Sequence, residues 1–197
     1  MKTLLHVGCG PKSKDELKGF DSGEWQEIRF DIDPAVSPDI VGTLTDMSGV
    51  KSESMDAVFS SHNIEHLFPH EVPVALSEFY RVLKRDGIVI ITCPDLVSVC
   101  QKIVSDRLLE PLYETPTGPI SPIDVLYGHR GLIAKGNHYM AHKSGFTFSV
   151  LRDCFFSAGF KIGFGGSRPQ AFDMWLMACK SVRPDNEIAK LASIYLP

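Results

Sequence analysis

Along the first half of the chain, short apolar runs alternate with amphipathic stretches. This pattern is typical of a parallel sheet covered by helices. The apolar runs predict strands at residues 3–7, 27–31, 39–41, 57–60 and 88–92. The sequence therefore predicts an α/β fold.

The clearest predicted helix covers residues 71–84. Apolar side chains, among them Val72, Leu76 and Phe79, recur there at steps of three and four residues, which places them on one face of a helix. Gly87 follows the stripe, and glycine often ends a helix because it tolerates left-handed backbone angles. We expect this face to be buried against the sheet.

The regular alternation stops between residues 96 and 145. A short helix is expected at 96–109, after which proline and glycine interrupt the chain repeatedly. Irregular segments of this length are usually functional or disordered, and this one is rich in tyrosine and histidine. We expect one domain over residues 1–197, in which residues 96–145 form an insertion that covers the substrate.

The remainder of the chain predicts a helix and two more strands. The helix is expected at residues 150–158 and the strands at 160–164 and 174–180, separated by a turn-prone segment at 165–169. The pattern after residue 182 indicates little beyond a short helix.

Composition narrows the class of protein. A formal net charge of −4 gives no polycationic footprint, so nucleic acid is not expected as a partner. No apolar run approaches the roughly 20 residues that span a membrane, and the apolar start is too short for a secretion signal. The five cysteines are scattered and form no Cys-x-x-Cys pair, which favours reduced thiols in the cytoplasm.

The ends of the first two predicted strands carry candidate chemistry. The first strand runs into Gly8-Cys9-Gly10, and the second ends at Asp31. A strand that ends in Gly-x-Gly lets a ligand lie against the main chain. A carboxylate at the tip of the next strand can accept hydrogen bonds from ribose hydroxyls. Together these residues predict a site for a nucleoside-bearing cofactor.

The order and spacing of these segments resemble the class I S-adenosylmethionine-dependent methyltransferases. The resemblance covers residues 2–94 and resumes over 146–180. It implies a Rossmann-like methyltransferase fold with a mostly parallel seven-stranded sheet and an antiparallel last strand. It also implies S-adenosylmethionine as the cofactor and, with the charge balance, a small-molecule methyl acceptor.

The resemblance also implies roles for individual residues. The Gly8–Gly10 loop would meet the methionine part of the cofactor, Asp31 the ribose, and Asp46 the adenine amino group, with the Met47 backbone beside it. The implied cofactor-binding set is Gly8, Cys9, Gly10, Asp31, Ile32, Asp46, Met47, Ser61 and His62.

The chain departs from the family pattern at two positions of its first motif. His6 stands where an acidic residue is usual, and Lys12 stands where a third glycine is frequent. These departures leave open a non-catalytic protein that binds S-adenosylmethionine or another nucleoside. A nicotinamide site is disfavoured because Ser13 replaces the last glycine of that fingerprint.

Methyl transfer needs alignment, exclusion of water and, for some acceptors, removal of a proton. Three histidines are candidates for a general base: His62, His129 and His142. The family usually has a helix before its first strand that covers the cofactor. Because this sequence starts directly with the strand, we expect the insertion to supply part of the cover.

A second motif overlaps the same region. His62, Glu65 and His66 form His-x-x-Glu-His, the pattern of inverted zinc metallopeptidases. Such a site normally needs a third protein ligand, and Glu110 and Glu114 lie in no convincing helix. We therefore expect no metal, and Glu65 is expected to open the helix that follows the fourth strand.

Overall fold

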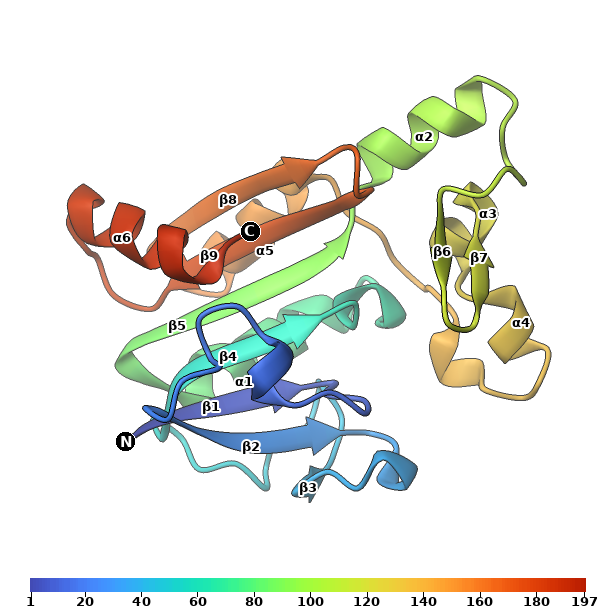
Figure 1. Cartoon of the computed structure of the whole chain (residues 1–197). Coiled ribbons are helices and arrows are strands. Elements are labelled where there is room, and N and C mark those ends of the chain that lie inside the picture. Colours follow the sequence, from blue (N-terminus) through green and yellow to red (C-terminus); the bar gives the residue numbers. More distant parts are fainter.

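The computed structural model describes residues 1–197 as one sheet with helices on both faces and an insertion at one end (Figure 1). The seven-stranded sheet has the order β3-β2-β1-β4-β5-β9-β8. Its strands are β1 (Lys2–Val7), β2 (Trp25–Asp31), β3 (Ile40–Val41), β4 (Met55–Ser61), β5 (Leu83–Pro94), β8 (Ile162–Arg168) and β9 (Asp173–Cys179).

Pairing in the sheet is parallel from β3 through β5. Leu5 at the centre of β1 is opposite Ile28 of β2 and Val58 of β4. β9 runs antiparallel to both of its neighbours, β5 and β8. The predicted mostly parallel seven-stranded sheet with an antiparallel last strand is confirmed.

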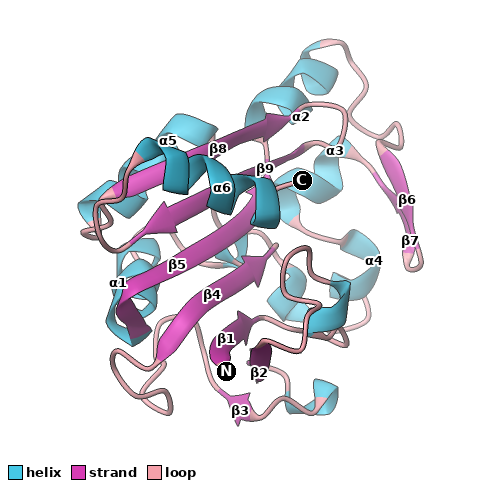
Figure 2. Cartoon of the chain, turned by 60° about the vertical axis from the view of Figure 1, so that its left-hand side comes forward, coloured by secondary structure: helices cyan, strands magenta, loops and turns pink.

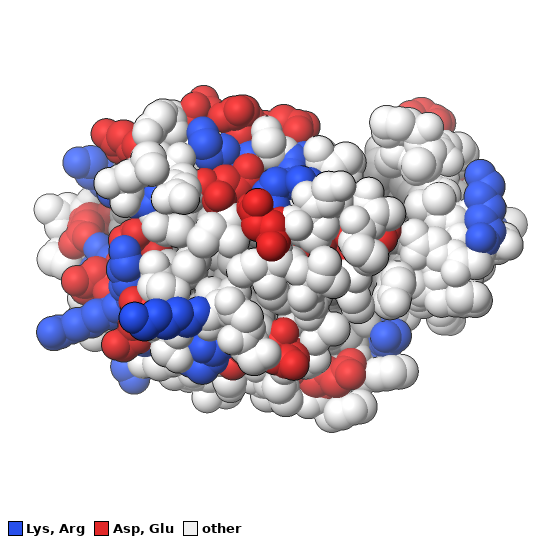
Figure 3. Space-filling model, turned by 90° about the horizontal axis from the view of Figure 1, so that it is seen from below, with Lys and Arg blue, Asp and Glu red and all other residues white.

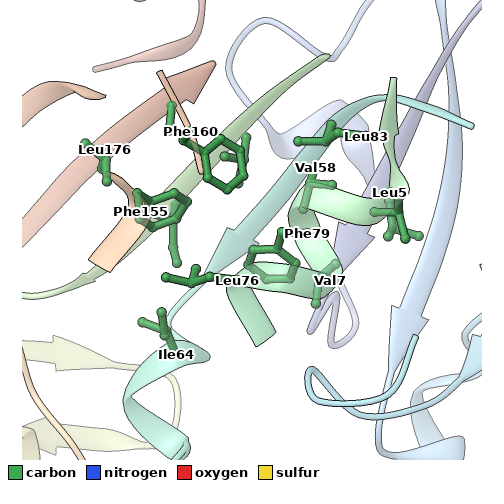
Figure 4. Packing of buried hydrophobic residues seen from close by; sticks show 14 of the residues in the cluster. Leu5, Val7, Val58, Ile64, Leu76, Phe79, Leu83, Phe155, Phe160 and Leu176 are labelled. Carbon is green, nitrogen blue, oxygen red and sulfur yellow. The ribbon is translucent and has the colours of Figure 1, made fainter. Parts of the chain in front are cut away.

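Successive side chains along the strands point to opposite faces of the sheet and pack into two hydrophobic cores. Leu5 faces helices α1 (Val72–Val82) and α5 (Phe148–Ser157), whereas its neighbour Leu4 faces helix α6 (Asp185–Tyr195) on the other side. Figure 4 shows the first core, where Phe79 of α1 packs near Val7 and Val58 of the sheet. Each fully buried leucine or phenylalanine contributes about 1.5–3 kcal/mol, so these cores fix the sheet.

One predicted boundary of α1 is wrong. Gly87 does not end the helix, because α1 stops at Val82 and the fully buried Leu83 pairs with Met55 as the first residue of β5. Glu65 lies, as predicted, in the first turn of the helix that follows β4, which is a short 3-10 helix, η3 (Ile64–His66), separate from α1.

The predicted turn at 165–169 is also misplaced. β8 continues to Arg168, which pairs with Asp173 at the start of β9. An Arg168 Nε–Asp173 Oδ1 contact of 2.8 Å closes this end of the ladder. The connection between the strands therefore lies after Arg168.

The insertion extends beyond the carboxyl ends of β4 and β5 (Figures 1 and 2). It starts with α2, which ends at Val104, earlier than the prediction, and its remaining elements are short. They are α2 (Leu96–Val104), the hairpin β6 (Tyr113–Thr115) and β7 (Gly118–Ile120), α3 (Pro122–Tyr127), α4 (Arg130–Ile133) and η4 (His138–Met140). Two further 3-10 helices, η1 (Lys14–Glu16) and η2 (Pro34–Val36), lie in the loops after β1 and β2.

Candidate functional site

The loop after β1 turns sharply at the carboxyl edge of the sheet. Gly8 and Gly10 both have left-handed backbone angles, with φ of 62° and 53°. The Gly8 N–H donates to Phe30 O at 2.8 Å, which ties the loop to β2. A Cβ on Gly8 would lie 2.0 Å from Asn63 Oδ1, whereas a Cβ on Gly10 would meet nothing within 4 Å. Gly8 is thus required for packing, and Gly10 faces open space.

Asp31 at the end of β2 is bonded directly to this loop. Its Oδ2 accepts a hydrogen bond from the Gly10 N–H at 2.8 Å, and its Oδ1 accepts one from the Asp33 N–H at 2.9 Å. The residue is 9% exposed. Each carboxylate oxygen can accept more than one hydrogen bond, so Asp31 retains acceptor capacity for a diol.

Ile32 and Asp46 border the same edge. Ile32 is 37% exposed and offers an apolar surface next to Asp31. Asp46 is exposed, and hydrogen bonds from Ser48 lower the pKa of its carboxyl below the ordinary value. Its charged form is therefore favoured near neutral pH.

Met47 has a structural position that the sequence did not indicate. Its side chain is fully buried, and its backbone N–H donates to Glu78 Oε2 at 2.8 Å. Arg81 holds the same loop through its carbonyls, with Nη2 donating to Met47 O at 2.8 Å and Nη1 to Val50 O at 2.9 Å. The Arg81 hydrogen bond lowers the pKa of Glu78. The signal in the sequence was the Glu-x-x-Arg spacing on α1.

His6, which stands where the family pattern has an acidic residue, contacts a carboxylate of the neighbouring strand β2. Its Nδ1 lies 2.7 Å from Glu27 Oε1 on β2, so a carboxylate occupies this region although β1 carries none. Burial lowers the pKa of His6 below its ordinary value, and Glu27 only partly offsets that effect. Lys12, the other departure, is exposed.

The chain after β4 carries a group of titratable side chains. We call His62, Glu65, His66 and His142 the Glu65 cluster. His62 follows Ser61, the last residue of β4, with a left-handed φ of 54°, and its N–H donates to Thr92 O at 2.8 Å. The His62 Nδ1 lies 3.3 Å from Glu65 Oε1.

The charge states within the Glu65 cluster depend on each other. Burial alone would raise the pKa of Glu65, but the neighbouring histidines, His62 first among them, outweigh it and lower that pKa. Desolvation likewise disfavours charge on His62, but Glu65 outweighs it and raises the pKa of His62. Burial lowers the pKa of His142, which keeps that imidazole neutral.

The structure brings two of the three candidate bases together. The His142 and His66 rings are 4.8 Å apart between centroids, so His142 joins His62 in the Glu65 cluster. His129 lies elsewhere in the insertion. Its Nε2 contacts Thr117 Oγ1 at 3.0 Å, and its Nδ1 accepts from the Leu132 N–H at 3.3 Å at the start of α4. Both ring nitrogens of His129 are thus engaged locally.

The strand order and the turn after β1 define a Rossmann-like methyltransferase fold. A sequence profile described as a methyltransferase domain matches residues 5–91. A comparison with curated proteins found no match. None of the helices is both long and apolar enough to cross a bilayer.

Solved structures show the same fold at low sequence identity. A Thermotoga maritima S-adenosylmethionine-dependent methyltransferase, a possible histamine N-methyltransferase, has a TM-score of 0.57 at 15% identity, over 92% of this chain and 83% of that one. The Burkholderia thailandensis 1,6-didemethyltoxoflavin-N1-methyltransferase, solved with S-adenosylhomocysteine, has a TM-score of 0.55 at 15% identity, over 91% and 71%.

A third neighbour is longer than this protein. The CMeT domain of the citrinin polyketide synthase has a TM-score of 0.55 at 12% identity; the match covers 92% of this chain but only 47% of that one. The matched profile over residues 5–91 and the shared fold make this chain similar to S-adenosylmethionine-dependent methyltransferases.

Proposed function

We propose that this protein transfers the methyl group of S-adenosylmethionine to a small-molecule acceptor. The observation that carries the proposal is the Gly8–Gly10 turn, which is hydrogen-bonded to Asp31 and open beside Gly10. Bound S-adenosylmethionine would supply a methyl group that its sulfonium charge already activates. The protein has to bind it, align it with the acceptor and keep water away.

Different residues at the carboxyl edge of the sheet would contact different parts of S-adenosylmethionine. Asp31 would accept hydrogen bonds from the ribose hydroxyls, and Ile32 would lie against the adenine ring. Asp46 is exposed for the adenine amino group, and the Glu78–Arg81 pair holds its loop in place. Because the Met47 N–H already donates to Glu78, we assign Met47 to packing.

The acceptor would enter between the end of β4 and the insertion. His62 and His142 lie there, and His142 stays neutral because burial lowers its pKa. A neutral imidazole can take a proton from an acceptor group. Ser61 and His62 would be the residues closest to the methyl group.

Surface charge supports a small molecule as the acceptor. On the face in Figure 3, lysine and arginine are mixed with aspartate and glutamate, and much of the visible surface carries no charge. A nucleic-acid substrate usually requires a continuous basic patch. The five cysteines are unpaired, which favours a reducing compartment, and we propose the cytoplasm.

Calorimetry with S-adenosylhomocysteine tests the cofactor site. We expect micromolar binding, weakened by Asp31→Ala by about 1.5–3 kcal/mol, the range for hydrogen bonds to a charged group. Asp33→Asn is the matched control, because the Asp33 side chain accepts a turn hydrogen bond from the Ala35 N–H that asparagine can retain. Absence of binding by the wild type, or equal affinity in Asp31→Ala, would contradict the assignment.

A further inference from the structure

Glu65 is a buried carboxylate whose hydrogen-bonding capacity is unmet. It is 1% exposed, and neither of its oxygens accepts a hydrogen bond. The nearby His62 lies within ion-pair distance, but the two groups are not aligned for a hydrogen bond. A buried polar atom that accepts no hydrogen bond costs free energy even where a charged group is near. The two unsatisfied oxygens of Glu65 therefore point to a ligand.

Two imidazoles beside Glu65 have the orientation of metal ligands. The His66 Nδ1 lies 3.1 Å from Ala141 O, and the His142 Nδ1 lies 2.7 Å from Val125 O. A carbonyl oxygen can only accept, so each Nδ1 carries the proton. In the neutral rings each Nε2 then carries a lone pair. Histidines that bind metals almost always donate their other ring N–H in this way.

The three side chains converge on one point. One ligand atom from each of Glu65, His66 and His142 lies within 4.8 Å of the others. The backbone holds the arrangement, because the N–H groups of Lys143 and Ser144 both donate to Glu65 O, at 2.8 and 3.1 Å. Ligand atoms around a tetrahedral zinc ion, each about 2.0–2.2 Å from the metal, lie closer together than this. Small side-chain movements would close the site.

We propose that Glu65, His66 and His142 bind one divalent transition-metal ion. Two imidazoles and one carboxylate are the donor set of open zinc sites and of non-haem iron(II) sites, which keep positions for further ligands. The site uses Glu65 and His66 of the sequence motif but not His62, and the insertion supplies its third ligand 76 positions after His66. His62 would orient Glu65. With the ion bound, His142 has no free lone pair, so His62 would then be the candidate general base.

The position of the ion suggests its role. It would join η3, directly after β4, to the end of the insertion, and so fix the cover on the sheet. Its remaining positions would take water or an oxygen atom of the methyl acceptor. Only this last step rests on the proposed function; binding of the ion does not.

Metal titration of the full-length chain tests the site. After treatment with a chelator, Co²⁺ is added and its visible absorption is followed, and Zn²⁺ is then used to displace it. We expect one ion per chain and a loss of at least 100-fold in affinity in His142→Ala and Glu65→Gln. His70→Ala and His138→Ala are the controls, because both histidines are exposed and lie outside the Glu65 cluster. These two variants should bind like the wild type.

Two further measurements keep the outcome decisive. S-adenosylhomocysteine affinity of each variant shows that it is folded, and His66→Gln replaces any variant that is not. Metal binding without S-adenosylhomocysteine binding would support the metal site and contradict the methyltransferase proposal, and the reverse result would do the opposite. A wild type that binds neither Co²⁺ nor Zn²⁺ stoichiometrically, or ligand variants with unchanged affinity, would overturn the metal site.

Discussion

The loop after β1 and the insertion lie toward the same end of the sheet but are held in different ways. The loop is fixed by short-range bonds to the next strand, from Gly8 to Phe30 and from Gly10 to Asp31. The insertion docks through a few contacts with η3, mainly to Glu65 and His66, from residues far along the chain. We infer that the loop binds the cofactor, which is common to all such methyl transfers, and that the insertion determines which acceptor is methylated.

Among the variants that test this difference between the loop and the insertion, removal of part of the insertion should have the largest effect. Replacement of residues 111–135 by a short Gly/Ser linker deletes the Val125 carbonyl that orients His142. We expect turnover to be abolished, because the acceptor side would be open to water, whereas S-adenosylhomocysteine affinity is largely kept. Turnover is measured by incubating labelled S-adenosylmethionine with metabolite pools, and S-adenosylhomocysteine affinity is measured by calorimetry. Full activity in the deletion variant would reduce the insertion to scaffolding.

The two glycines of the loop should differ in what they contribute. Gly8→Ala places a Cβ against Asn63, which donates to Val7 O at 3.1 Å. Strain and overpacking together should cost about 2–4 kcal/mol, measured by urea unfolding. Gly10→Ala meets no atom and should cost only about 1–2 kcal/mol, yet it should weaken S-adenosylhomocysteine binding. Equal stability losses in the two variants would contradict this distinction.

Asp124 should stabilise the insertion but not the sheet. It is buried, contacts Arg130 Nε at 2.7 Å and accepts from the Ser121 N–H at 2.9 Å. Asp124→Asn should cost about 1–3 kcal/mol, seen as faster hydrogen exchange in α3 and α4 but not in the sheet. Asp106→Asn, at an exposed residue of the same segment, is the control.

The same carboxyl predicts a pH dependence. Burial would raise the pKa of Asp124, but the hydrogen bond from Arg130 and its other partners outweigh burial and lower it. A group with a lowered pKa stabilises the fold fully above its unfolded value, here 3.8, and loses that contribution as the pH falls through the folded value. Protection of α3 and α4 should therefore decline below about pH 4 in the wild type and less in Asp124→Asn. An equal decline in both proteins would exclude Asp124 as the cause.

The smallest expected effect is at the loop that carries Asp46. Glu78→Gln removes the charge that pairs with Arg81 at 2.6 Å but keeps an oxygen that can accept from the Met47 N–H. We expect a loss of about 0.5–1 kcal/mol in stability and a several-fold loss in S-adenosylhomocysteine affinity. Ser77→Ala, which removes only a hydroxyl bonded within α1, is a control on the same helix and should leave the affinity unchanged.

The two regions also differ in how far the sequence could predict them. The apolar runs located the strands, and Gly8, Gly10 and Asp31 could be predicted to meet because consecutive parallel strands end at one edge. Glu27 as the partner of His6 was missed, since pairing register between strands is not visible in a single run. The meeting of His142 with Glu65 was missed because only the folded insertion brings those residues together.

The direct test of the central claim is a crystal structure of the protein with S-adenosylhomocysteine. We expect the ribose hydroxyls to bind Asp31, the backbone of Gly8–Gly10 to lie along the ligand, and the sulfur atom to face His62 and the insertion. Ligand bound at another place on the molecule, or a sulfur atom facing away from the insertion, would contradict it.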